Sequence, residues 1–147
     1  MVRARRSLVY PASRHAPLEP VNLGDRDVRE RLSGPALKAF FNVMRRWQVR
    51  DEDARALLGG VTNGPYYLMK RDPGRLLDAD RLTRVSYIVG IFKALHLLHS
   101  EALADRWVQL PNSNRIFAGS TPLAYMIRGG LPAFAIVRQL LDARRAG

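Results

Sequence analysis

Large apolar residues recur at spacings of three and four along most of this chain, and this helical period constrains the fold more than any other feature. Three stripes carry the period, and their residues are Leu37, Phe40, Phe41, Met44 and Trp47, then Leu82, Val85, Val89, Phe92, Leu95 and Leu98, and finally Phe134, Val137, Leu140 and Leu141. No segment shows the alternation of apolar and polar residues that is typical of a strand. The sequence therefore predicts an all-α fold.

Capping and turn residues divide the chain into helices and three parts. Helix starts are indicated at Asp51, Thr62, Asp78 or Asp80, and Thr121-Pro122, and helix ends at Gly59-Gly60, Pro73-Gly74 and Gly129-Gly130. We expect a flexible basic arm over residues 1–34, a helix-turn-helix part over 35–77 that begins with a helix at Pro35, and a long helix with a small helical domain over 78–147. The first 20 residues hold four arginines and three prolines, which suits either a structureless cationic tail or a specific DNA-contacting arm.

The charge balance points to a polyanionic partner. Lys and Arg number 24 against 13 Asp and Glu, which gives a net charge of +11, and a chain this basic most often meets nucleic acid. A well-solvated surface is the alternative. The most apolar run, residues 87–98, is interrupted by Lys93 and His96, and the N-terminus lacks an apolar segment typical of a secretory signal. We therefore expect a cytoplasmic protein with no membrane partner.

The strongest local pattern is a helix, a glycine turn and a second helix over residues 54–71. Ala56 lies four positions before Gly60, whereas Tyr66 and Met69 lie six and nine positions after it, as the small contact and the two anchors of a helix-turn-helix do. Gly59 departs from the pattern, since an apolar residue is usual there. The candidate DNA-binding residues are Thr62, Asn63, Tyr66, Tyr67, Lys70 and Arg71. An ordinary helical hairpin is the alternative interpretation.

Residues suited to catalysis or to metal binding are scarce. The chain has no cysteine, which excludes disulfides and thiolate ligands. His96 and His99 lie three positions apart on one predicted helix, but only His15 remains to complete a shell. No phosphate loop and no Ser/His/Asp arrangement is visible. We therefore predict a binding protein rather than an enzyme, with no cofactor, no metal site and no catalytic residue.

Two further runs carry a family resemblance. The first is the conjunction of Trp107, Pro111-Asn112, Phe117, Gly119, Thr121-Pro122-Leu123, Met126 and Gly129-Gly130, and the second comprises Ala56-Leu57-Leu58-Gly59 and Ile88-Val89-Gly90-Ile91. The first run resembles the toxin-binding domain of the Xre/MbcA/ParS antitoxin family, and the second is similar to that family's Xre-like helix-turn-helix. The resemblance covers about residues 37–147 and leaves the arm unmatched.

The resemblance implies a type II antitoxin whose partner is a RES-domain toxin that consumes NAD or uses it to ADP-ribosylate a target. It implies that the C-terminal domain covers the toxin's NAD-binding cleft, while a helix-turn-helix paired by homodimerisation represses the operon by binding operator DNA, within a toxin-antitoxin hetero-oligomer. The outer face and tip of the last helix are the expected toxin contacts, namely Ile136, Arg138, Gln139, Ala143, Arg144, Arg145 and Gly147. The alternative is a free-standing helix-turn-helix transcriptional regulator whose C-terminal half only dimerises.

Overall fold

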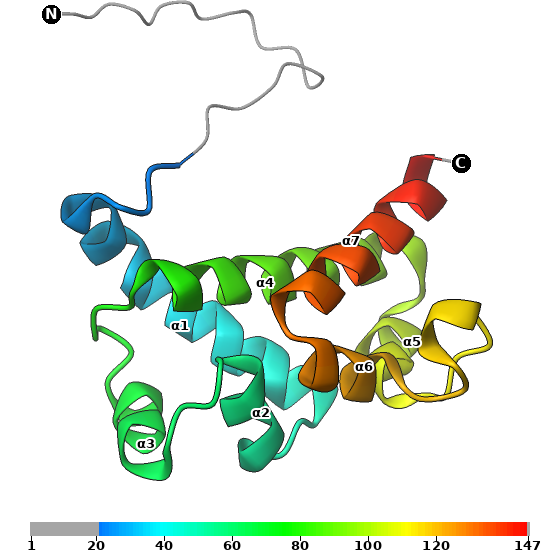
Figure 1. The fold of residues 1–147 in the computed structure, drawn as a ribbon, viewed down its shortest axis with the longest axis horizontal. Coiled ribbons are helices and arrows are strands. Elements are labelled where there is room, and N and C mark those ends of the chain that lie inside the picture. The colour runs from blue at the N-terminus through cyan, green and yellow to red at the C-terminus, as the bar shows by residue number, and fades with distance from the viewer. Residues whose placement is uncertain (1–20, 147) are drawn as a thin grey trace, which may run out of the picture.

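A computed structural model describes residues 21–146 of the chain, and within them the fold consists of helices joined by short turns (Figure 1). The elements are α1 (Arg26–Trp47), α2 (Asp51–Leu57), α3 (Asn63–Arg71), α4 (Ala79–Leu98), α5 (Glu101–Arg106), the 3₁₀ turns η2 (Trp107–Gln109) and η3 (Arg115–Phe117), α6 (Pro122–Gly129) and α7 (Leu131–Ala146). The described residues contain no strand, so the predicted all-α fold is confirmed. The expectation of a flexible segment over residues 1–20 lies outside the described residues, as does Gly147.

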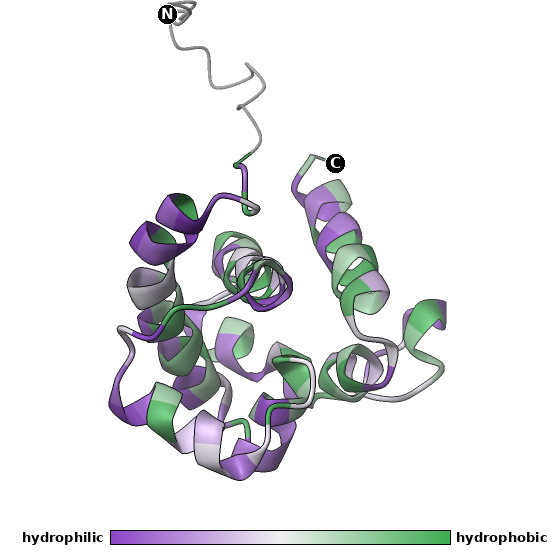
Figure 2. Cartoon of the chain, turned by 60° about the vertical axis from the view of Figure 1, so that its left-hand side comes forward, coloured by the Kyte–Doolittle hydropathy of each residue, from purple (hydrophilic) through white to green (hydrophobic). Residues whose placement is uncertain are grey.

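Helix α4 is the centre of the bundle, and both α1 and α7 pack along it. Trp47 at the end of α1 lies 6.3 Å from the Phe92 ring, and Arg84 lies 5.9 Å from the Phe134 ring of α7. Ile88 and Ile91 are fully buried in addition to much of the predicted stripe, because α7 covers a second side of the helix. Figure 2 shows hydrophobic and hydrophilic residues interspersed along these helices, as expected of helices that bury one side.

Helix α1 begins earlier than its sequence pattern indicates. It starts at Arg26, where the Asp25 side chain accepts a hydrogen bond from the Asp27 N–H at 2.9 Å, and Pro35 lies inside it. The prediction that this helix begins at Pro35 is wrong, and residues 26–34 belong to the helical body rather than to the arm. Proline inside a helix removes one backbone hydrogen bond, and here the packing of α1 outweighs that loss.

A buried serine connects this early part of α1 to the segment between α3 and α4. The Ser33 hydroxyl donates to the Arg29 carbonyl at 2.6 Å and accepts from the Leu77 N–H at 2.9 Å. Both Ser33 and Leu77 are 1% exposed. The hydroxyl therefore satisfies a buried backbone N–H and holds the start of α4 against α1.

The turn between α2 and α3 explains the doubled glycine. Gly59 and Gly60 have φ angles of +95° and +90°, a conformation that side chains rarely adopt. A Cβ at Gly59 would also lie 3.1 Å from Arg84 Nε. Thr62 then occupies the N-cap position of α3 as predicted, although its side chain makes no capping hydrogen bond. The departure at Gly59 is thus a requirement of the turn.

The C-terminal helices follow their predicted caps. The Thr121 side chain accepts from the Ala124 N–H at 3.0 Å at the start of α6, and Gly130, with φ of +66°, separates α6 from α7. Phe134, Val137 and Leu141 of α7 are fully buried against the core. The predicted inward stripe of α7 is confirmed except for Leu140, which is only partly buried.

Candidate functional site

The outer face of α3 presents most of the candidate DNA-binding residues to solvent. Thr62, Asn63, Tyr67, Lys70 and Arg71 are all exposed. Two further cations, Arg75 and Lys38, are also exposed near the end of α3, and Lys38 lines a hollow with the turn at residues 72–74. The surface around α3 therefore combines hydrogen-bond donors with positive charge, as a surface that contacts DNA phosphates and bases requires.

Tyr66 does not belong to this face, and its place among the DNA-binding candidates is corrected. Its side chain is 1% exposed and packs 5.7 Å from the Phe41 ring of α1. Its hydroxyl donates to Asp51 at 2.9 Å. Tyr66 therefore acts only as the anchor that its spacing from Gly60 also predicted, and together with buried Met69 it fixes which side of α3 faces outward.

Asp51, the first residue of α2, connects the two helices of this unit. One of its carboxylate oxygens accepts from the Tyr66 hydroxyl and from Lys70 Nζ, both at 2.9 Å, and the other accepts from the Tyr67 hydroxyl at 2.9 Å. Lys70 Nζ also lies 5.8 Å and 6.0 Å from the centres of the two tyrosine rings. Two of the candidate DNA contacts, Tyr67 and Lys70, are therefore engaged by an anion of the protein itself.

This cluster shifts the ionisation of its members in a consistent direction. The hydrogen bond from Lys70, followed by that from Tyr66, lowers the pKa of Asp51. Burial, and then the hydrogen bond to Asp51, raises the pKa of Tyr66, and the hydrogen bond to Asp51 raises the pKa of Tyr67. The carboxylate thus stays charged and the two phenols stay protonated at neutral pH. Sequence reasoning missed this role of Asp51, because it took the residue as the N-cap of α2. That assignment is wrong: Arg50 occupies the N-cap position, and Asp51 is the first residue of the helix.

The second candidate surface is the outer face of α7. Ile136, Gln139 and Ala143 are exposed at spacings of three and four, so they form one stripe along the helix. The tip adds the exposed Arg144 and Arg145. The stripe and the tip keep the solvent-facing placement that the sequence predicted for them.

Arg138 differs from the other candidates on α7, because it turns towards α4. Its Nε lies 3.1 Å from Asp142, and its guanidinium lies over Gly90, where a Cβ would overlap it. The side chain is only about one-third exposed. Glycine at position 90 therefore gives this arginine room to lie between α7 and α4, and the prediction that Arg138 faces fully outward is corrected.

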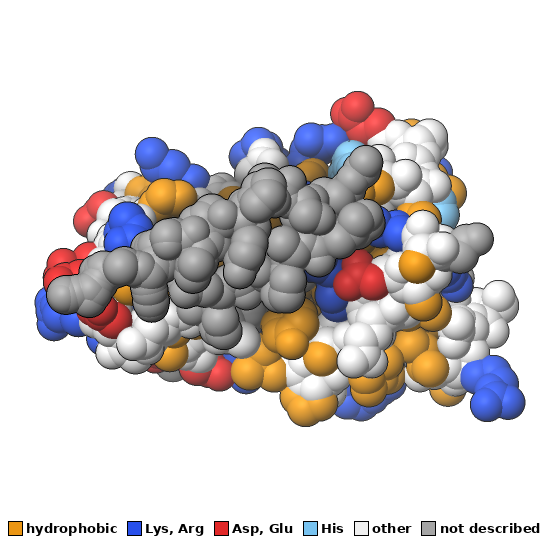
Figure 3. All heavy atoms as spheres, turned by 90° about the horizontal axis from the view of Figure 1, so that it is seen from above, with side chains coloured by type: hydrophobic (Ala, Val, Ile, Leu, Met, Phe, Trp, Pro, Cys, Tyr) orange, Lys and Arg blue, Asp and Glu red, His pale blue; other side chains and the backbone are white. Residues whose placement is uncertain are grey.

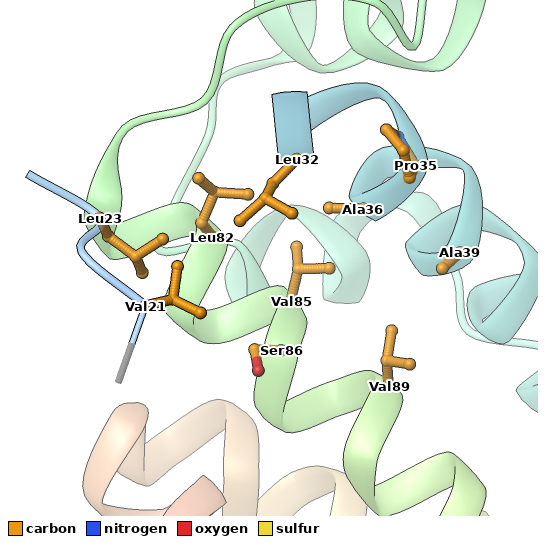
Figure 4. A pocket seen from close by; sticks show the side chains of 10 residues that line it. All are labelled: Val21, Leu23, Leu32, Pro35, Ala36, Ala39, Leu82, Val85, Ser86 and Val89. Carbon is orange, nitrogen blue, oxygen red and sulfur yellow. The ribbon is translucent and has the colours of Figure 1, made fainter. Parts of the chain in front are cut away.

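An apolar groove of about 360 Å³ lies between α1 and α4. Figure 4 shows the side chains around it, which come from residues 21–23, from α1 and from α4, and Ser86 is the one polar side chain among them. Seen from above, hydrophobic side chains gather in the lower right part of the view, with Lys and Arg side chains on its margins (Figure 3).

His96, one of the two histidines that the sequence singled out, has partners within the protein. His96 Nδ1 lies 2.9 Å from the Phe92 carbonyl and Nε2 lies 3.0 Å from Asp105 Oδ1, which also pairs with Arg46 through its second oxygen. Residues 21–146 contain no group of three or more His, Cys, Asp or Glu that could hold a metal ion. None of the helices in this range is both long enough and apolar enough to cross a membrane.

Comparison with known proteins places the chain in a family. The family model described as antitoxin Xre/MbcA/ParS C-terminal toxin-binding domain matches residues 93–147, from the second half of α4 onwards. A Sinorhizobium fredii (strain NBRC 101917 / NGR234) protein described as uncharacterized protein y4oB is 38% identical over 112 residues, which are 76% of this chain and 84% of that protein. No solved structure gave a significant match. The chain therefore belongs to the Xre/MbcA/ParS antitoxin family, and residues 93–147 form its C-terminal toxin-binding domain.

Proposed function

We propose that this protein is the antitoxin of a type II toxin-antitoxin pair, that it neutralises a RES-domain toxin through α7, and that it represses its own operon through α3. The observation that carries the toxin half is the match of the toxin-binding domain to residues 93–147, in which α7 presents an exposed stripe. The family is one of regulatory proteins, which supports inhibition by binding rather than catalysis. A homodimer would present two copies of α3 to a two-fold symmetric operator.

The geometry of α7 supports inhibition by occupancy. Ile136 is 41% exposed, although it is a large apolar residue, and such a side chain beside Gln139 and Ala143 suits the apolar core of a protein interface. The cationic tip, Arg144 and Arg145, would reach the mouth of a cleft that binds the NAD pyrophosphate. Cations at a helix C-terminus stabilise the helix by about 0.3–1 kcal/mol, and this effect is enough to explain Arg144 and Arg145. It does not explain the exposed Ile136.

Truncation tests the tip, and a matched pair of substitutions tests the stripe. The antitoxin ending at Leu141 should fail to preserve growth and cellular NAD in cells that express the toxin. Ile136→Glu should weaken co-purification of the toxin at least tenfold. The control is Ile116→Glu, because Ile116 is 37% exposed in the same domain but lies on η3. Equal toxin binding by both variants would remove the α7 stripe from the interface, and full protection by the truncated protein would remove the tip.

The α2–α3 unit supports the DNA half of the proposal. We assign residues 35–77 to DNA binding and 78–147 to toxin binding. Asn63, Tyr67, Lys70 and Arg71 form the exposed recognition face of α3, and Tyr66 and Met69 lie beneath them. Figure 1 shows α3 and the C-terminal end of α7 at opposite ends of the molecule, so both partners can be bound at once.

Removing the two cations of α3 tests this half. Lys70→Ala/Arg71→Ala should weaken binding to a labelled duplex taken from directly upstream of the protein's own gene, while toxin binding stays unchanged. Each lost phosphate contact should lower the slope of log K against log salt by about 0.9. The control Lys93→Ala/Arg128→Ala removes the same charges from exposed positions elsewhere. Asn63→Ala or Tyr67→Ala should alter sequence preference, because a base contact contributes about 1–3 kcal/mol.

Two results would redirect this assignment. Unchanged DNA binding by all the α3 variants would remove the DNA role from this helix. Operator binding together with the absence of a RES reading frame beside the gene would favour the alternative, a free-standing transcriptional regulator.

A further inference from the structure

We propose that Asp51 is an internal competitor for DNA: its carboxylate occupies the place of a DNA phosphate on α3 and must release Tyr67 and Lys70 before these side chains can bind the nucleic acid. This inference rests on the proposed role of α3 in DNA binding. It assigns to Asp51 a regulatory role, because the residue would hold the affinity of the free protein for DNA below the value that the cations of α3 allow.

The geometry of the cluster resembles a bound phosphate. A phosphate in a DNA backbone carries one negative charge on two exposed oxygens, and lysine and tyrosine are among the side chains that donate to it. The Asp51 carboxylate also carries one charge on two oxygens, and it accepts from Tyr67 and Lys70 at 2.9 Å each. The two donors therefore already converge on one anion at the surface of α3. Asp51 is 39% exposed, so the anion lies on the surface that DNA would approach.

The three donors of the cluster have different freedom to leave it. Tyr66 is buried, and its ring packs against Phe41 of α1, so its hydroxyl stays bonded to Asp51. Tyr67 and Lys70 are exposed, and Tyr67 is 48% exposed, so both side chains can turn outward without disturbing the core. Asp51 therefore keeps one buried donor when the two outer donors move to DNA. The release needs only side-chain rotation and no rearrangement of α2 or α3.

The competition predicts the direction in which a substitution of Asp51 changes the affinity for DNA. Asp51→Asn retains an oxygen that accepts from tyrosine, but it removes the charge that holds Lys70. Exposed ion pairs of this kind are weak, so the gain in DNA affinity should be about fivefold. Lys70 contacts a phosphate in the complex of either protein, so the slope of log K against log salt should be nearly the same for Asp51→Asn and wild type. The gain should appear with operator and random DNA alike, because a phosphate contact carries no sequence information.

A matched substitution separates this effect from a simple change of net charge. Glu52 is the next residue on α2, its side chain is exposed, and it pairs only loosely with Arg50, at 3.6 Å. Glu52→Gln changes the net charge by the same amount as Asp51→Asn and leaves the contacts of α3 intact. The full-length variants should be compared for binding to the labelled upstream duplex and to a random duplex of equal length, over a series of salt concentrations.

The expected result is that Asp51→Asn binds both duplexes about fivefold more tightly than Glu52→Gln does, with a similar salt slope. In the double variant Asp51→Asn/Lys70→Ala this excess should disappear. If Asp51→Asn does not fold, as judged by circular dichroism, Asp51→Glu provides the second test, because the longer side chain keeps the charge and should leave affinity within about twofold of wild type.

The outcomes also distinguish the two proposals. If Lys70→Ala/Arg71→Ala leaves DNA binding unchanged, the proposed DNA role of α3 fails and this inference fails with it. If that variant weakens binding but Asp51→Asn binds no more tightly than Glu52→Gln, the competition is refuted alone. Weaker binding by Asp51→Asn would show that the carboxylate orients Tyr67 and Lys70 for DNA rather than competing with it.

Discussion

Replacing Ser33 by alanine should destabilise the protein far more than the same replacement at an exposed position on a helix. The Ser33 oxygen accepts from the Leu77 N–H, which is buried and has no other hydrogen-bond partner among the described residues. Leaving such a donor unpaired costs about 1–3 kcal/mol. Alanine is the better helix former and returns about 0.5 kcal/mol. The net loss in the free energy of unfolding should therefore be about 0.5–2.5 kcal/mol.

Urea denaturation measures this loss directly. The fluorescence of Trp47 and Trp107 reports unfolding, because both side chains are buried. The transition midpoint should fall with an unchanged m-value, and the melting temperature should fall by about 2–4 °C per kcal/mol. Ser86→Ala is the matched control, since Ser86 is an exposed serine on α4. Equal stability of the two alanine variants would refute the reasoning that Ser33 satisfies a buried backbone group.

Four further outcomes are expected. Phe134→Ala should destabilise by about 3–5 kcal/mol in the same urea experiment, because it empties a fully buried site between α7 and α4, and a loss below about 1 kcal/mol would contradict that packing. Thr121→Ala should cost about 1 kcal/mol of stability through the lost cap of α6, and a neutral result would mean that the cap hydrogen bond contributes nothing. The pKa of Asp51 is lowered on folding, so its stabilising contribution is present above pH 3.8 and is lost as the pH falls through the lowered value. Asp51→Asn should therefore flatten the dependence of the free energy of unfolding on pH in this acidic range. An unchanged pH dependence would exclude the contribution. The pKa of Tyr66 is raised on folding, so its contribution to stability is present below pH 10 and is lost at higher pH. Ultraviolet absorbance of the folded protein follows the titration of the tyrosines. Titration of every tyrosine near pH 10 would refute the raised pKa.

The sequence alone determined the local features of this protein. The caps at Thr62 and Thr121, the breaks at Gly59-Gly60 and Gly129-Gly130 and the inward residues of α7 could all be predicted. Each depends on residues within about one turn of helix, so its physical cause is contained in a short stretch of chain. The family resemblance was also visible in the sequence, because its motif residues are spread along the chain in a specific order.

Tertiary structure alone decided the features that join distant segments. The sequence pattern placed the start of α1 at Pro35, but the helix begins at Arg26. In the part of α1 that the pattern missed, the hydroxyl of Ser33 binds a backbone group 44 positions away. The cluster at Asp51 depends likewise on donors 15 to 19 positions along the chain, brought together only when α3 folds back across α2. A local pattern cannot reveal such partners, because hydrogen bonds and ion pairs depend on distance in space, and the packing of helices sets that distance.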